Sequence, residues 1–311
     1  MKKTIALLLV VAAAFMMFSC GSAGTEQTTP TTQTTAATSA STEGTEDNLT
    51  WNITELAPYA DIDFANGEMF EVNEVLTLEF KAAGAAAPAT VEEAKVSFDG
   101  KSAEMTVLRI TDAGAYVKAT FSEFAGAKEF DSFVKENGGI SIEAFYLDNS
   151  TGNTVRGIVC CTESVENGRA STRSGWGIAE DNGKPYFIAG NSQNNAYASV
   201  YAKESASENE LVHVIAIFDN ANQKISLYIN GVLQNAKASA GEFTSADKQE
   251  YFEKFNMANI FYIGSDPTGQ NRINGDFPAD DLTVADVKIY AKALSKDEVA
   301  YAYHLASSLF E

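Results

Sequence analysis

Residues 211–231 have the sequence LVHVIAIFDNANQKISLYING, and this stretch decides the fold class. Its first eight residues are apolar on both alternations, which predicts a strand buried on both faces. The DNAN that follows carries turn chemistry, and KISLYIN then alternates between apolar and polar positions, as a half-buried strand does. Asn230-Gly231 is a strong hairpin signal because both residues tolerate a positive φ. The stretch predicts an antiparallel meander, with residues 232–236 as the returning strand.

The same pattern extends outward in both directions. A second hairpin is predicted at 175–189, where GWGIA and PYFIA flank the turn DNG. Many short strands with Gly and Asn turns are typical of a β-sandwich or barrel. The further strands are predicted at 97–99, 140–147, 157–162, 198–202, 260–263 and 284–290.

A few short helices are expected between the strands. Two are predicted at 130–136 and 246–255. The third begins after Ser295, which caps it, with Glu298 in the capping-box position. Its core-facing side is predicted to hold Val299, Ala302, Tyr303 and Ala306.

Four segments carry a resemblance to a known family. They are Ser97 to Gly100, Ile140 to Tyr146, Val212 through Gly231, and Val284 to Ser295 with Glu298. In this order they resemble the laminin G-like domains of the concanavalin A-like lectin/glucanase superfamily. The specific motifs are HV…LYING and VKIYAKALSxxE; the FDG at 98–100 is weak by itself. The resemblance implies an all-β jelly-roll sandwich of two antiparallel sheets, and what such a fold does has to be argued from a site.

The resemblance also raises a structural calcium, which relatives hold with an Asp near the first strand and one near the last. Ala285 replaces an acidic residue that often stands in the last motif, which puts that site in doubt. Candidate oxygen ligands remain at Asp61, Asp63, Asp280 and Asp281, since hard cations need several oxygens. The alternative for each is a solvated acidic surface.

The N-terminal segment predicts export and lipid attachment. Lys2 and Lys3 precede an apolar run that is shorter than the roughly 18 residues of a membrane span. The small residues around Cys20 resemble a bacterial lipobox, with residues 1–19 as the signal peptide and Cys20 as the acylated residue. The alternative is an ordinary signal peptide with a chance cysteine. Residues 20–50 are rich in Thr, Ser and Ala and predict a disordered tether before one domain at 51–311.

The net charge of the chain limits the kinds of molecule that it is expected to bind. The chain has 22 basic and 42 acidic residues, and the part after residue 50 holds 20 and 38 of them. A net charge near −18 argues against nucleic acid and anionic membrane surfaces, and is compatible with neutral sugars, cations or basic proteins. Cys160 and Cys161 are adjacent on a predicted strand, so their side chains are expected on opposite faces as core residues rather than as a disulfide.

The sequence lacks the marks of the family's glycosidases. Retaining enzymes use two carboxylates about 5 Å apart, and the laminarinase-type members show them as ExDxxE, which does not occur here. Glu143 and Asp148 are five residues apart, so they are expected on opposite faces of a strand. His213 holds the family's packing position, and His304 has no metal partner at helical spacing. Glycoside hydrolysis is therefore the least favoured function.

A sugar site needs a flat aromatic face and amide or carboxylate groups for hydroxyls. The richest local composition is NSQNNAY at 191–197, near the hairpin that starts at 175. The hypothesis is that Arg173, Trp176, Asn194, Asn195 and Tyr197 contact a glycan. For Trp176 the favoured alternative is core packing, and for the Asn-rich segment a polar turn.

The resulting prediction is a non-catalytic protein of the bacterial cell envelope, lipid-anchored to the outer membrane on its cell-surface or periplasmic side. It binds an extracellular glycan, or alternatively a surface protein as an adhesion module.

Overall fold

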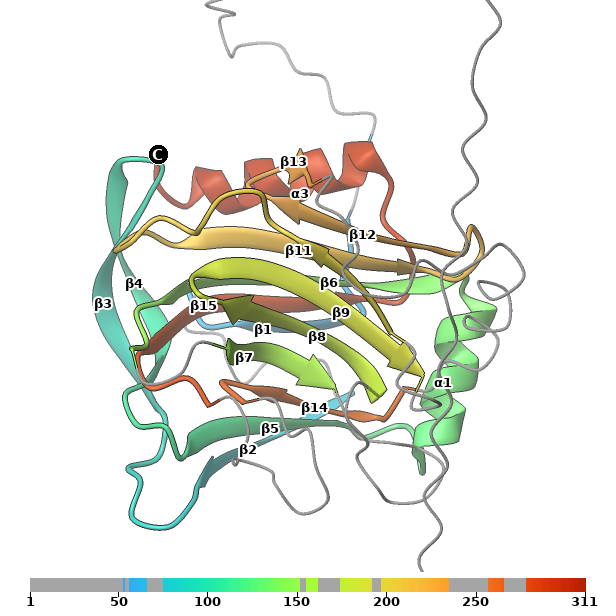
Figure 1. Cartoon of the computed structure of the whole chain (residues 1–311), viewed down its shortest axis with the longest axis horizontal. Helices are drawn as coiled ribbons and strands as arrows, with labels where there is room; N and C mark the ends of the chain where they lie inside the picture. The colour runs from blue at the N-terminus through green and yellow to red at the C-terminus, as the bar shows by residue number, and fades with distance from the viewer. Residues whose placement is uncertain are drawn as a thin grey trace, which may run out of the picture. The chain divides into compact units, whose positions relative to one another are not determined.

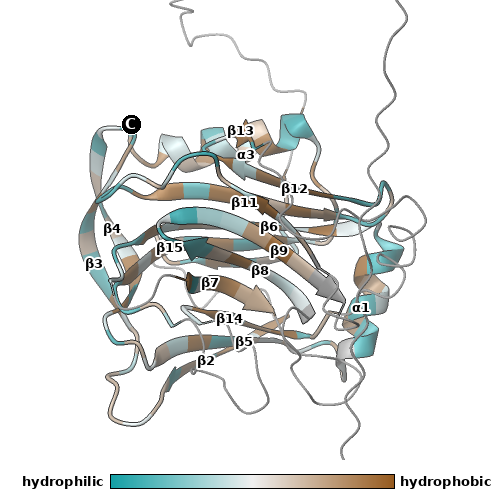
Figure 2. Ribbon diagram, viewed as in Figure 1, coloured by the Kyte–Doolittle hydropathy of each residue, from teal (hydrophilic) through white to brown (hydrophobic). Residues whose placement is uncertain are grey.

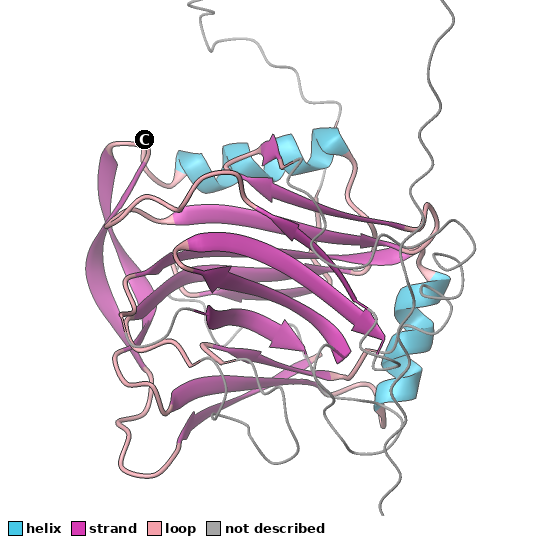
Figure 3. Cartoon of the chain, viewed as in Figure 1, coloured by secondary structure: helices cyan, strands magenta, loops and turns pink. Residues whose placement is uncertain are grey.

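The computed structural model describes residues 53, 56–65, 75–151, 155–161, 174–191, 197–234, 257–265 and 278–311, all in the unit Thr50–Glu311. These residues form mainly strands (Figure 3), together with helices α1 (Ala127–Glu136) and α3 (Lys296–Ser308). The strands make two antiparallel sheets that face each other (Figure 1), which confirms the predicted sandwich. In the described residues no helix is both long and apolar enough to cross a membrane.

Sheet A is built from strands that come from both ends of the domain. Its order is β13-β12-β11-β6-β15-β4-β3, and β1 also pairs with β15. Its members are β1 (Ala60–Asp63), β3 (Thr90–Phe98), β4 (Lys101–Ile110), β6 (Gly139–Asp148), β11 (Val212–Asp219), β12 (Lys224–Ile229), β13 (Val232–Leu233) and β15 (Leu282–Tyr290).

Sheet B has the order β10-β9-β8-β7-β14-β5-β2. Its members are β2 (Leu76–Ala82), β5 (Ala115–Phe121), β7 (Val155–Cys161), β8 (Ser174–Asp181), β9 (Lys184–Asn191), β10 (Tyr197–Tyr201) and β14 (Ile260–Ile263). Because strands distant in sequence lie side by side in both sheets, much of the fold depends on non-local pairing.

Both predicted hairpins are present. β11 and β12 pair antiparallel, and Asn230 and Gly231 follow with φ of 48° and 74°. β8 and β9 are joined by Asn182 and Gly183, with φ of 52° and 75°. In each turn the residue types that tolerate a left-handed backbone occupy the positions that need one.

The main core lies between the sheets. Alternate residues of β11, from Val212 to Phe218, enter it, while Ile215 and Ile217 belong to a separate cluster on the other face. Hydrophobic colour dominates β11, whereas α3 shows both hydrophilic and hydrophobic residues (Figure 2). Strand β11 is therefore buried on both of its faces, which explains why it is apolar at nearly every position.

Helix α3 packs against the second face of sheet A. Ser295 accepts from the Glu298 amide and Glu298 accepts from the Ser295 amide, so the predicted capping box is present. Val299, Ala302 and Ala306 are buried, as predicted. Tyr303 is only partly buried and packs beside Phe98 and His213.

Several elements differ from the sequence-based prediction. Helix α1 begins three residues earlier than predicted, at Ala127. The helix predicted at 246–255 lies outside the described residues. The β3–β4 hairpin is far longer than the predicted strand at 97–99, and the sequence pattern does not predict the strands β1, β2, β4 and β5.

The adjacent cysteines behave as predicted. Both are free and buried in β7. Cys161 belongs to the core between the sheets, whereas Cys160 lies on the other face, beside Gly177.

Candidate functional site

The ends of three neighbouring strands meet at one edge of sheet B. The register pairs Ser174 with Asn191, and Gly190 pairs with both Gly175 and Tyr197. The predicted Tyr197 is the first residue of β10, and Arg173 directly precedes β8. Arg173, Asn194 and Asn195 lie outside the described residues. The strand register thus brings together the ends of β8, β9 and β10, which are adjacent to the segments of the predicted glycan site.

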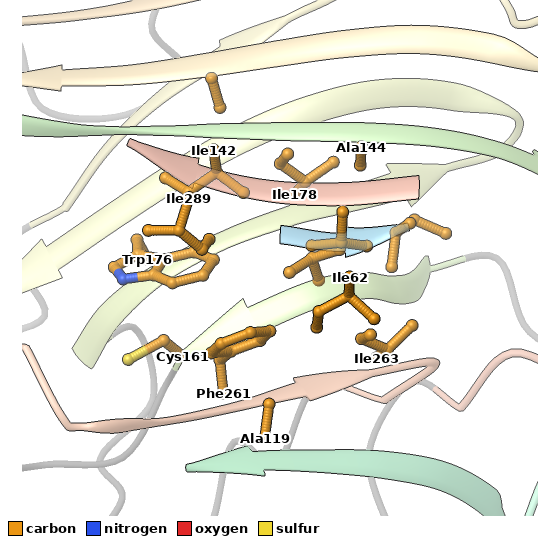
Figure 4. Packing of buried hydrophobic residues seen from close by; sticks show 14 of the residues in the cluster. Ile62, Ala119, Ile142, Ala144, Cys161, Trp176, Ile178, Phe261, Ile263 and Ile289 are labelled. Atoms are coloured by element: carbon orange, nitrogen blue, oxygen red, sulfur yellow. The ribbon is translucent and has the colours of Figure 1, made fainter. Parts of the chain in front are cut away.

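Trp176 does not belong to that site. Its side chain is 1% exposed, and the indole lies among Cys161, Phe261 and Ile289 in the core between the sheets (Figure 4). The prediction of a ligand contact for Trp176 is therefore wrong, and the favoured alternative of core packing is the observed one. The cause is strand alternation, because Trp176 points inward on β8 with Ile178.

The outer face of sheet B carries tyrosines, yet these are closed to solvent. Tyr116, Tyr186 and Tyr262 are 8%, 7% and 1% exposed. Tyr186 stacks on Tyr201 with ring centroids 4.8 Å apart, and Tyr116 meets Tyr262 edge-on at 6.0 Å. A sugar cannot stack on rings so buried. The sheet face itself is thus a poor ligand platform, and the strand ends are the better candidate.

A buried polar network joins the two sheets. Arg156 on β7 donates from Nε to Asp148 Oδ2 at 2.5 Å and from Nη2 to Glu180 Oε2 at 3.5 Å. The Tyr146 hydroxyl of β6 donates to Glu180 Oε1 at 3.1 Å. Burial, together with the charge of Asp148, raises the pKa of Glu180 to about 7. Burial likewise raises the pKa of Tyr146.

A second buried network lies on the face of sheet A that α3 covers. Glu143 lies 2.9 Å from His213 Nε2 and accepts from the Tyr290 hydroxyl at 2.6 Å. Although burial opposes ionisation, the contacts with His213 and the charge of Lys288 hold the pKa of Glu143 well below its usual range. His213 is 1% exposed, which agrees with the packing role predicted for it.

The family described as the concanavalin A-like lectin/glucanases superfamily matches residues 125–300. The chain belongs to this superfamily. A search of curated proteins gave no match.

Solved structures of the same architecture include binding domains of botulinum neurotoxins. The serotype G domain superposes with a TM-score of 0.51 at 13% identity, over 81% of this chain and 52% of that one. The serotype D domain gives 0.48 at 14% identity, over 80% and 51%. The chain spans about half the length of these neighbours. At such identities the likeness shows the fold alone.

The superfamily includes glucanases, and the described residues of this chain include three carboxylates with buried side chains. Asp148 and Glu180 are the pair that one guanidinium bridges, and their side chains are 0% and 1% exposed. Glu143 is also buried, and the ring of its partner His213 packs against Phe145 and Tyr303. A glycosidase pair has to reach the sugar and a water molecule. These three carboxylates hold the fold together instead.

The candidate calcium ligands lie at two different places in the structure. Asp61 and Asp63 pair with Lys288 and Asp286, whereas Asp281 precedes the opposite end of β15. Seven residues of extended chain separate Asp281 from Lys288, about 20 Å. In the described part of the chain no three His, Cys, Asp or Glu side chains are close enough to hold a metal ion. The structure thus separates Asp61 and Asp63 from Asp281, and calcium binding by these aspartates stays a prediction.

Each pair of aspartates has local interactions instead. Asp281 accepts from Arg109 at 2.9 Å, and Asp280 accepts from the Thr151 amide at 3.0 Å. Beside Asp61, Lys288 donates to Asp286 and lowers the pKa of Asp61 against the larger effect of burial, which raises it to about 6. A lysine thus supplies positive charge to this acidic patch.

The sequence missed both buried networks. The local pattern predicts opposite faces for Glu143 and Asp148 but no partner for either, and it predicts no role for Arg156 or Glu180. One signal was available, because Glu180 alternates with Trp176 and Ile178 on the inward side of β8. A charged residue at an inward position requires a partner.

Proposed function

We propose that the chain is a non-catalytic, extracytoplasmic binding protein that captures a glycan at the joint end of β8, β9 and β10. The observation that carries this proposal is the strand register, which pairs Ser174 with Asn191 and Tyr197 with Gly190, so that the ends of the three strands lie side by side. The Asn-rich segment and Arg173 continue directly from these strand ends. Amide, hydroxyl and guanidinium groups are the donors and acceptors that sugar hydroxyls need.

Other features agree with binding rather than hydrolysis. The buried carboxylates described above are committed to internal partners. The superfamily contains lectins, and a neurotoxin neighbour with a TM-score of 0.51 is described as a binding domain. The acidity of the domain favours a neutral glycan over an anionic one.

The test uses the full-length chain in detergent on a glycan array. Tyr197→Ala is expected to lower glycan binding at least tenfold, because the aromatic ring at the strand end is lost. Tyr301→Ala, on α3, serves as the matched control and is expected to bind as the wild type does. Retention of full binding by Tyr197→Ala would contradict the proposed site.

The same preparation separates the alternative functions. A wild-type chain that binds no glycan, yet captures a host or neighbouring-cell protein in a pulldown, would favour the adhesion module. Release of reducing sugar from β-glucans would overturn the non-catalytic assignment.

The anchor is part of the proposal. A lipid on Cys20 would hold the domain at the outer membrane through a chain of about thirty residues, which reaches at most about 100 Å. Labelling of the cells with a radioactive fatty acid should mark the protein, and Cys20→Ala should lose the label. Undiminished label in Cys20→Ala would refute lipidation at this residue.

A further inference from the structure

Two buried carboxylates share one guanidinium where the sheets meet. Asp148 and Tyr146 come from β6 of sheet A, and Arg156 and Glu180 come from β7 and β8 of sheet B. The side chains of Asp148, Arg156 and Glu180 are 0%, 8% and 1% exposed. This group is separate from the strand ends of the proposed glycan site.

The charges of this group do not balance when both carboxylates are ionised. Among the described residues, the charged or titratable groups that face Glu180 are Arg156 from β7 and Tyr146 and Asp148 from β6. Its cross-strand partner on β9 is Pro185, which carries no charge. With Glu180 protonated, Asp148 and Arg156 balance each other and the group is neutral, whereas ionisation of Glu180 leaves a net negative charge in a buried place, which is costly.

The network also reaches the loops beside it. Asp148 Oδ1 accepts from the Ser150 amide at 3.0 Å. The Ser150 hydroxyl in turn accepts from the amides of Asp280 and Asp281 at 2.8 and 2.9 Å. A change in the position of Asp148 therefore disturbs the segments that enter and leave the two sheets here.

We propose that Asp148, Arg156 and Glu180 form a proton-controlled clamp between the sheets, closed when Glu180 is protonated and loosened when that proton leaves. After the proton leaves, both carboxylates are charged, Arg156 can neutralise only one of them, and the two carboxylates repel each other inside the buried group. The device makes the domain tighter in mildly acidic surroundings than in neutral or alkaline ones. It does not depend on the identity of the ligand.

The direction of the pH effect follows from the proton balance. Glu180 has a pKa of about 7 in the folded protein, above its ordinary value of 4.5. The folded state therefore binds more protons between these values, and stability falls as the pH rises from about 4.5 to 7. The unfolding equilibrium constant is expected to rise by roughly a hundredfold or more over this window through Glu180 alone.

Denaturant unfolding of the full-length chain at pH 5 to 8 tests the clamp. Glu180→Gln should flatten the pH dependence, and Asp148→Asn should do the same because the remaining carboxylate then has Arg156 to itself. Glu93→Gln, on the exposed β3, is the matched control and should keep the wild-type slope. A wild-type slope in both clamp variants would overturn the proposal.

A measurement on the wild type covers the case in which these variants fail to fold. The carboxyl carbon of Glu180, followed by NMR, should titrate with a midpoint near pH 7. The protection of residues 149–151 and 280–281 against hydrogen exchange, measured relative to the intrinsic exchange rate at each pH, should fall over the same range, while that of β11 changes less. A Glu180 midpoint near its ordinary value would overturn the clamp.

Discussion

Strand β6 presents two buried carboxyl groups to two different environments, and the contrast shows what determines whether a buried carboxyl group is ionised. Glu143 faces α3, where a histidine, a tyrosine hydroxyl and a nearby lysine all favour its charged form. Five residues later, Asp148 faces sheet B, where a second carboxylate competes with it for one arginine. Depth of burial is similar at both places. The charges nearby, rather than burial, separate the two networks: His213 and Lys288 lower the pKa of Glu143, whereas Asp148 adds to the effect of burial and raises the pKa of Glu180.

The two networks should therefore respond to pH in opposite directions. The Glu143 contribution to stability is present above its ordinary pKa and is lost as the pH falls below it, because its folded pKa is depressed. The Glu180 contribution is lost as the pH rises toward 7. Between these limits both networks are satisfied, which places the most stable pH of the pair near 5.

The largest effect is expected from removal of the shared cation. Arg156→Met leaves two carboxylates in a buried space without a positive partner, and should lower the free energy of unfolding by about 3–5 kcal/mol at pH 8. At pH 5 the loss should be smaller, because the carboxylates can take up protons. Denaturant titration at both pH values measures the difference.

Arg109→Met is the matched control for this change. Arg109 pairs with Asp281 at the surface, where the side chains are 23% and 42% exposed, so its loss should cost less than about 1 kcal/mol. Equal losses in the two variants, or a loss in Arg156→Met that is independent of pH, would contradict the contrast between the networks.

A smaller effect with the opposite pH trend is expected on the other side of β6. Glu143→Leu removes the acceptor of His213 and Tyr290 and should cost about 3 kcal/mol at pH 6. The gap between this variant and the wild type should narrow between pH 4.5 and 3, since the wild type loses the same interaction on protonation. Thermal or denaturant unfolding over this range checks it, and a gap that widens toward pH 3 would refute the assignment.

The contrast also shows what sequence reasoning could and could not reach. The hairpins, the capping box and the core position of the thiols follow from local patterns that a single segment contains. Alternation even placed Glu143 and Asp148 on opposite faces of their strand. The partners Arg156, Glu180, His213 and Tyr290 come from four other strands, however, and no local pattern specifies which strands are neighbours.

The failures of the site prediction have the same origin. Nearness to the Asn-rich segment predicts a glycan contact for both Trp176 and Tyr197. Their positions on the strands differ, however, and Trp176 points inward. The four aspartates were grouped by residue type, and the register of β1 with β15 keeps the two pairs apart. Neither nearness in the sequence nor residue type determines which side chains lie together in a sandwich; the pairing of strands across the sheet does.

The smallest and sharpest comparison uses the two tyrosine hydroxyls. Tyr290→Phe removes a donor 2.6 Å from an ionised carboxylate and should cost about 2 kcal/mol, with little change between pH 6 and 8. Tyr146→Phe removes a donor 3.1 Å from Glu180, which is protonated below pH 7, and should cost about 1 kcal/mol at pH 6. Above pH 7 the ionised Glu180 depends more on that hydroxyl, so the cost of Tyr146→Phe should rise toward that of Tyr290→Phe. Unfolding of both variants at pH 6 and 8 gives the four values. If the cost of Tyr146→Phe stays constant while that of Tyr290→Phe varies with pH, the protonation states of the two networks have been assigned the wrong way round.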